Sequence, residues 1–183
     1  MAKAMTGSFY LTETVTLPAA TATGGRVQGT IDLGAYVNVA TGQAVAVESV
    51  DVVIQHGGNL NQFGSNLLAG DGCISSQLTD LNPGTAFVRA DNQSLIASSA
   101  LNLDDSANIL SHMIDLYPDN HGPANLSEAF MVVNDSLYFV AGNDGSAVGT
   151  GDVFVTARIK CRIAKLSSKD WMAIAIQSTA SDN

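Results

Sequence analysis

Basic residues are scarce in this 183-residue chain and gather near its C-terminal end. Only eight residues are Lys or Arg, and five of them lie within twelve positions: Arg158, Lys160, Arg162, Lys165 and Lys169. Residues 1–157 carry 15 acidic and three basic residues, a net charge of −12, whereas residues 158–183 carry two acidic and five basic residues, a net charge of +3. Closely spaced Arg and Lys side chains can bind phosphates or pair with carboxylates. We call Arg158, Lys160, Arg162 and Lys165 the basic stripe, and it is the main candidate site of the sequence.

The residue types used in catalysis and metal binding occur without the spacing that those functions need. His56, His112 and His121 do not pair at the short intervals of a zinc site. The segment "QHGGN" is similar to an oxyanion-hole loop, but no G-x-S-x-G follows it. The segment "GSAVGTGD" is neither a P-loop nor a dinucleotide-binding turn. We therefore expect no enzyme activity, no cofactor and no metal ligands, and leave open only whether calcium binds "YPDNHGP" or "GNDGSAVGTGD".

Three further residues leave alternatives open. Glu13 interrupts the apolar face of residues 9–17, which indicates either an edge or rim position or a buried carboxylate with a partner. A glycosidase needs two facing carboxylates, so Glu13 alone does not predict one. Cys73 and Cys161 belong to no CxxC or Cys/His cluster, so we expect two unpaired thiols, with a disulfide as the alternative.

Charge is low throughout the chain. Charged residues make up 14% of the sequence, against roughly 25% in ordinary soluble domains, while the hydrophobic fraction is 46% and the net charge −9. This composition indicates either a surface buried against other copies or a neutral, loop-rich β protein. No segment approaches the ~20 apolar residues of a membrane span and none reads as a signal peptide, so we expect a soluble, non-secreted protein without a transmembrane segment.

Alternation of apolar and polar residues predicts strands at 9–17, 26–39, 44–55 and 153–163. The second of these is interrupted by Gly29 and Gly34 and is either one bent strand or two short ones. In 44–55 the apolar positions switch from odd to even numbers near Glu48 and Ser49, which predicts a β-bulge. In 153–163 the odd-numbered residues form an apolar face, and Thr156, Arg158, Lys160 and Arg162 form the other.

The remaining segments give weaker patterns. Residues 55–73 predict a long surface loop, 85–90 and 94–100 short strands, and 104–117 a helix, or alternatively a strand over 109–116. Residues 129–142 predict a hairpin that turns at Asn134 and Asp135. The segment 167–170 predicts a helix cap before "WMAIAIQ". Together these elements predict an all-β antiparallel sandwich, formed as a single domain by residues 1–183 with a short C-terminal helix.

This organisation resembles the single jelly-roll coat proteins of icosahedral viruses: one sandwich of under 200 residues with long polar loops, few charges and no enzyme motif. That family folds eight strands into two facing sheets and builds closed shells. The resemblance implies a structural capsid protein that self-assembles with other copies, assembles in the host cytoplasm and resides in the virion. It leaves open the host, the genome type, the shell geometry and the presence of a second capsid protein or an internal membrane.

Two observations qualify this resemblance. The segment "MAKAMTGSFY" has a single lysine, whereas small coat proteins that package single-stranded RNA carry a basic N-terminal arm, so we do not expect genome neutralisation by an arm. The alternative function is a non-catalytic sandwich module for carbohydrate binding or cell-surface adhesion. Exposed aromatic side chains would favour that module, but aromatic residues are only 6% of the chain.

The basic stripe has three interpretations: pairing with acidic residues of other copies, pairing with strands beside it, or contact with nucleic acid. Nucleic-acid binding usually comes with a basic overall charge and stacking aromatics. Since the chain is acidic, we favour pairing with carboxylates. Under that hypothesis, reversing Arg158 and Arg162 to Glu impairs assembly and leaves the fold intact.

Overall fold

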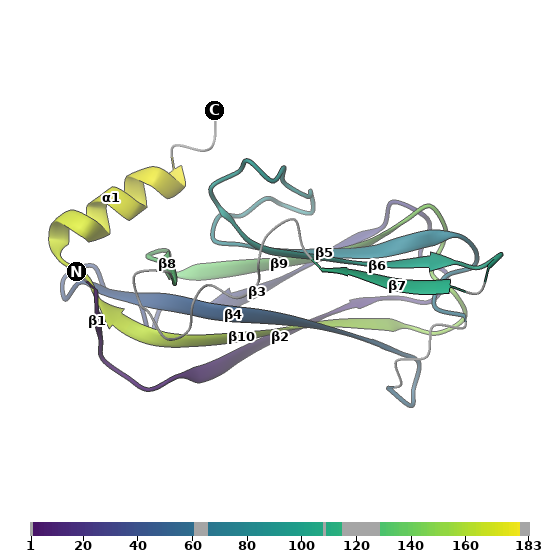
Figure 1. Cartoon of the computed structure of the whole chain (residues 1–183), viewed down its shortest axis with the longest axis horizontal. Helices are drawn as coiled ribbons and strands as arrows, with labels where there is room; N and C mark the ends of the chain where they lie inside the picture. Colours follow the sequence, from purple (N-terminus) through teal and green to yellow (C-terminus); the bar gives the residue numbers. More distant parts are fainter. Residues whose placement is uncertain (1, 61–65, 108, 115–128, 180–183) are drawn as a thin grey trace.

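Two five-stranded sheets and one helix make up the described part of the chain, which covers residues 2–60, 66–107, 109–114 and 129–179 of this computed structural model (Figure 1). Sheet A contains β1 (Lys3–Ala4), β2 (Phe9–Leu17), β4 (Gln43–His56), β8 (Phe130–Val132) and β10 (Val153–Lys165). Sheet B contains β3 (Arg26–Asp32), β5 (Gly72–Thr79), β6 (Leu95–Asp104), β7 (Ile109–Ile114) and β9 (Ser136–Asp144). The helix α1 spans Ser168–Thr179.

The strand order is that of a jelly roll. Sheet A runs β2-β10-β4-β8, and β1 continues the β2 side by pairing with the end of β10. Sheet B runs β3-β9-β5-β6, with β7 added beside β6. When the strands other than β1 and β7 are lettered B to I in chain order, the two sheets read B-I-D-G and C-H-E-F, with every pairing antiparallel. The predicted all-β sandwich of jelly-roll type is therefore confirmed.

The core lies between the two sheets and follows the alternation seen in the sequence. Along β10, Val153, Val155, Ala157, Ile159 and Cys161 are fully buried, and the residues between them point away from the core. They meet large side chains of the facing sheet, including Phe139, Leu137, Ile74 and Leu78. Because successive strand residues alternate between faces, the buried set leaves Arg158, Lys160 and Arg162 on the outer face of sheet A.

The predicted bulge is present at Glu48. Lys160 of β10 pairs with Ser49 and the next residue, Cys161, pairs with Val47, so Glu48 is the extra residue of β4. The insertion keeps Val47 and Val50 both buried although they are three positions apart. It also directs the Glu48 side chain toward the bases of the neighbouring strand.

The predicted hairpin at 129–142 is wrong. Residues 130–132 form β8 in sheet A, whereas β9 lies in sheet B, so the connection crosses between the sheets. Asn134 holds this crossing in place, because its side-chain amide donates to the backbone oxygen of Asp80 at 2.9 Å. Apolar and polar residues alternate on both sides of the turn whether the two strands pair in one sheet, as in a hairpin, or lie in different sheets, as in an arch. The sequence pattern therefore does not distinguish the two.

The predicted strand at 85–90 is also wrong, because this segment forms no ladder and belongs to a loop that spans residues 80–94. The loop folds against sheet B through side chains. Gln77 exchanges two hydrogen bonds with the backbone of Val88, and Gln28 donates to Asn82 and to the carbonyl of Gly84. Backbone groups that a strand would pair with a neighbour are here satisfied by glutamine side chains.

Five other predictions have mixed outcomes. The predicted strand at 94–100 is confirmed as the first part of β6, and the predicted 26–39 strand is a single one that ends at Asp32. Residues 109–114 form a strand, so the helix alternative is wrong there, and residues 115–117 lie outside the described residues. In the predicted 55–73 loop, 57–60 and 66–71 have no strand, but Leu67 and Leu68 are buried in the core. The helix cap is confirmed, since the Asp170 amide donates to Ser167 Oγ at 3.1 Å.

Gly149 allows three segments to meet, which gives a prediction. Its amide donates to Leu67 and its carbonyl accepts from Ala20, and a Cβ atom at this position would collide with the backbone oxygen of Asn66. We expect Gly149→Ala to lower the free energy of unfolding by about 1–3 kcal/mol, measured by urea denaturation. Gly7→Ala, where a Cβ meets nothing, is the control and should change it by less than about 0.5 kcal/mol. Equal stability of the two variants would contradict this account.

Candidate functional site

The outer face of sheet A carries Arg158, Lys160 and Arg162 of the basic stripe. From β2 it presents Tyr10, Thr12 and Thr14, all exposed, and from β10 it presents Thr156 and Arg158. Thr14 and Thr156 share a hydrogen bond of 2.9 Å across the two strands. The same face carries bases of β10 and Asp51 of β4, so it offers hydroxyl groups together with a small set of charges to a partner.

The buried carboxylate of Glu48 lies at one end of this face, among the bases. Its side chain is only 1% exposed, although it is directed to the outer side of sheet A. One carboxylate oxygen pairs with Arg162, and the other lies 3.8 Å from Lys160 Nζ and accepts a hydrogen bond of 2.9 Å from Ser8 Oγ. The bases therefore cover the acid, and the acid neutralises part of the basic stripe.

The four residues of the basic stripe consequently have different surroundings. Arg162 forms an ion pair with Glu48. Lys160 lies at the longer distance of 3.8 Å from the same carboxylate, and one third of its side chain is exposed. Arg158 is exposed, stacks on the ring of Tyr10 at 5.4 Å, and is paired in register with Asp51 of β4. Lys165 is exposed and lies opposite Lys3 of β1. Reversing Arg162 to Glu would place two carboxylates together at a buried position, so this residue is not a clean probe of contacts between copies.

Glu13 points into the space between two edge strands. It is partly exposed on β2, and a Cβ atom on Gly29 of the facing β3 would collide with its carboxylate. Partial burial raises the pKa of Glu13. The structure agrees with the edge interpretation, since β2 and β3 each pair with one neighbouring strand along this side. An inward-pointing charge at such a position also discourages further strand pairing.

The cysteines and the Gly-rich loops show no site of their own. Cys73 and Cys161 are both free, as predicted, and burial beside Glu48 raises the pKa of Cys161 to about 12, so this thiol stays protonated. In "GNDGSAVGTGD", Asp144 binds Arg26 through both oxygens and Asp152 accepts from the Ala19 amide. "YPDNHGP" lies outside the described residues. Within the described ranges no cluster of three or more His, Cys, Asp or Glu could hold a metal, and no helix is long and apolar enough to cross a membrane.

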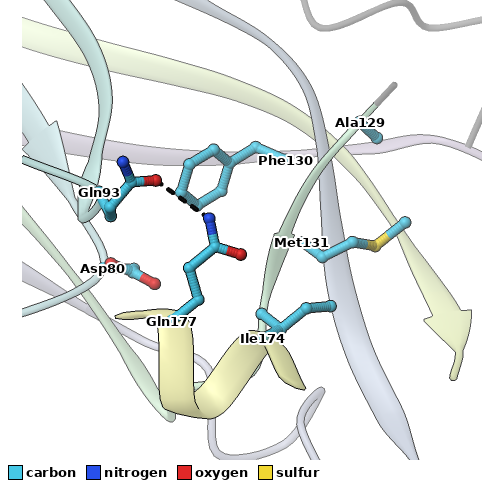
Figure 2. A pocket seen from close by; sticks show the side chains of 7 residues that line it. All are labelled: Asp80, Gln93, Ala129, Phe130, Met131, Ile174 and Gln177. Carbon is cyan, nitrogen blue, oxygen red and sulfur yellow. Dashed lines mark hydrogen bonds between the residues drawn. The ribbon is translucent and has the colours of Figure 1, made fainter. Parts of the chain in front are cut away.

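A second candidate site, not predicted from the sequence, is a cavity of about 250 Å³ beside α1 (Figure 2). It is lined by Asp80, Gln93, Ala129, Phe130, Met131, Ile174 and Gln177. Asp80 is only 2% exposed, and burial raises its pKa to about 7 even though Asn134 donates to its carboxylate. Nothing in the sequence around Asp80 indicates this, because the cavity is formed by residues from a loop, a strand and the C-terminal helix.

Comparison with known proteins finds similarity in structure and not in sequence. No protein-family model and no curated protein matches the chain. Solved structures similar to it include VP1 of Merkel cell polyomavirus from an unassembled pentamer, with 8% identity over 90% of this chain and 98% of that one and a TM-score of 0.45. Two others are mud crab dicistrovirus (9% identity, 88% and 70% coverage, TM-score 0.39) and cocksfoot mottle virus (12%, 89% and 87%, 0.31).

These neighbours are viral capsid proteins. They agree with the resemblance drawn from the sequence pattern. The sequence identities and TM-scores are too low for residue roles to be transferred from these proteins. The jelly roll is identified by the strand order of this chain. The structure thus establishes a jelly-roll fold, and function has to be argued from the surfaces of the chain itself.

The Glu48 cluster gives a prediction for stability. We expect Glu48→Gln to lower the free energy of unfolding by about 2–4 kcal/mol, because Arg162 and Lys160 would lose their buried counter-charge. Asp51→Asn, an exposed carboxylate on the same strand, should cost less than about 1 kcal/mol. Combining Glu48→Gln with Arg162→Gln should recover part of the loss in urea denaturation. A Glu48→Gln protein as stable as the wild type would contradict the assigned role.

The raised pKa of Asp80 gives a prediction for pH. The folded protein keeps the Asp80 proton at pH values where the unfolded chain, with a pKa near 3.8, has lost it. The stability from this group is therefore complete below about pH 4 and is lost as the pH rises toward 7, at most about 4 kcal/mol in all. Asp80→Asn should remove this part of the pH dependence, measured by urea denaturation between pH 4 and 8, while Asp105→Asn should keep it. Parallel pH profiles for wild type and Asp80→Asn would contradict the assignment.

Proposed function

We propose that residues 1–183 form one jelly-roll domain that acts as a structural subunit and self-assembles into an icosahedral virus shell. In this role its partners are other copies of itself and its location is the virion. The observation that carries the proposal is the exposed outer face of sheet A, where threonine hydroxyl groups lie beside a small set of charges of both signs, some of them paired with one another, on a protein whose net charge is −9.

Burial of a neutral polar face is less costly than burial of a charged one, because ionised groups lose much more hydration free energy. Interfaces that form and pack well are accordingly depleted in charge at their centres. The hydroxyl groups of Thr12 and Thr14 keep this face soluble in a free subunit and can bond a neighbour in an assembled one. A jelly roll is one of the folds that viral capsids use, and the strand order here is compatible with that use.

The free members of the basic stripe support contacts between subunits. Arg158 and Lys165 are exposed, whereas Lys160 and Arg162 pair with Glu48. With two of its four bases directed to an internal carboxylate, the stripe offers less charge to a nucleic acid than the sequence alone indicated. Exposed bases in an acidic protein meet carboxylates of other copies most often, and such pairs set register more than affinity.

The alternative of a carbohydrate-binding or adhesion module is less well supported by this face. Such modules use exposed aromatic rings, and Tyr10 is the one large aromatic side chain among the strongly exposed apolar residues described. Its ring is already covered in part by Arg158.

The proposal predicts a charge-sensitive assembly. We expect the double variant Arg158→Glu, Lys165→Glu to shift the protein from large particles toward free subunits in size-exclusion chromatography with light scattering and negative-stain imaging. Neither residue touches the Glu48 cluster, so the urea denaturation midpoint should stay near that of wild type. Arg89→Glu, which reverses an equally exposed base in the 80–94 loop, is the matched control and should leave particle size unchanged.

Three outcomes separate the hypotheses. A wild-type protein that stays monomeric at high concentration across salt and pH would overturn the assembly role. Normal assembly of the double variant would show that Arg158 and Lys165 are not needed for the contacts between subunits. Normal assembly combined with loss of nucleic-acid retention would assign Arg158 and Lys165 to phosphate contacts instead.

A further inference from the structure

The cavity beside α1 contains a buried carboxylate oxygen without a donor. Asp80 is fixed from two sides: its amide donates to Ser94 at 3.1 Å, and its backbone oxygen and Oδ2 both accept from Asn134 Nδ2. The other carboxylate oxygen, Oδ1, is buried and has no hydrogen-bond partner in the described part of the chain. A buried acceptor left without a donor is destabilising, and more so when it is charged. A ligand that supplies the missing donor would therefore be bound at this position.

The walls of the cavity restrict the chemistry of that ligand. Among the described residues that line it, Asp80 is the one that can ionise, and its single carboxylate can balance one positive charge. Phe130 contributes an aromatic ring, and Met131 and Ile174 contribute apolar surface, as Figure 2 shows. Aromatic rings attract cations, and apolar walls accommodate the methylene stem of a long basic group. A divalent metal ion would need several more oxygen ligands than one carboxylate provides.

Two exposed glutamine side chains lie at one side of the cavity. Gln177 of α1 donates to Gln93 of the 80–94 loop at 3.0 Å, and Figure 2 shows this pair beside Phe130 and Asp80. Both glutamines belong to exposed residues. Their amides can exchange this hydrogen bond for bonds to an entering donor without leaving a buried group unpaired.

We propose that this cavity binds one alkylammonium or guanidinium group, which donates to Asp80 Oδ1 while its stem lies along Met131 and Ile174. The group has two sources: a free small organic cation, or a Lys or Arg side chain of a second copy of the chain. The binding chemistry is the same for both, and only the second source rests on the proposed assembly function.

The first experiment tests the chemistry on the full chain. Methylguanidinium and butylammonium are titrated at constant ionic strength and at a pH above about 7, where Asp80 carries its charge, and binding is followed by NMR shifts. We expect saturable binding to the wild type, about tenfold or more weaker binding to Asp80→Asn, and unchanged binding to Asp105→Asn, an exposed carboxylate elsewhere. The neutral analogues methylurea and butanol should not saturate. No saturable binding, equal binding to Asp80→Asn, or equal binding of the neutral analogues would each overturn the proposal.

A second pair of variants protects the test against misfolding at Asp80. Gln177 is an exposed helix residue, so its replacement does not endanger the fold. Gln177→Lys should place an ammonium group beside Asp80 in the same chain, raise the denaturation midpoint and block methylguanidinium, whereas Gln177→Met, of similar length and uncharged, should not block it. Equal methylguanidinium binding by the two variants would count against the site.

The final comparison separates the two sources. If a side chain of a second copy occupies the cavity, Asp80→Asn should weaken assembly, and excess methylguanidinium should compete with assembly of the wild type. If the ligand is a free cation, Asp80→Asn should assemble normally, and wild-type particles should still bind methylguanidinium. Because the titration on free subunits does not depend on assembly, failure of the proposed function and failure of this site remain distinguishable.

Discussion

The buried carboxylate of Glu48 is the charge around which sheet A is arranged. It reaches its position because β4 carries one extra residue opposite β10, and there it is in contact with Arg162, Lys160 and Ser8. A bulge without those partners would bury an unpaired acid, and without the bulge the Glu48 side chain would not be directed toward Arg162 and Lys160. The contact joins the central strand pair of sheet A to the segment between β1 and β2. Register, bulge and charge are thus fixed together.

This arrangement explains why the protein can be so poor in charge and still contain well-placed ionic contacts. Arg26, another of the few bases, is held by Asp144, by two carbonyls and by the ring of Phe87. Arg26 and Arg162 fix strands and loops, whereas Arg158 and Lys165 remain exposed. The acidic excess is then spread over loops and strand ends, and the outer face of sheet A is almost neutral.

Sequence reasoning was reliable where burial alternates with period two and unreliable where contacts come from distant segments. The strand at 153–163 and the bulge at Glu48 follow from the parity of apolar residues, which the pleat of a strand enforces. The arch at Asn134 and the loop at 85–90 do not follow from alternation. The Asn134 side chain donates to the Asp80 backbone, and the Val88 backbone bonds to the Gln77 side chain, and no local pattern reveals these partners. The sequence shows the basic stripe as a set of bases. It does not show that Arg162 pairs with Glu48 while Arg158 stays exposed, because that difference depends on where the bulge places Glu48. The cavity at Asp80 required helix, loop and strand together.

The pairing of β2 with β10 has a consequence for how the chain reaches its native state. Thr14 and Thr156 are hydrogen-bonded although 142 positions separate them. Sheet A therefore cannot be completed until almost the whole chain is available, and the entropy of closing so long a loop is lost before these contacts form. Folding should be slow and cooperative, with β4 left as an open edge in any earlier intermediate. A chain of this topology is exposed to premature association through that edge before its own last strand covers it.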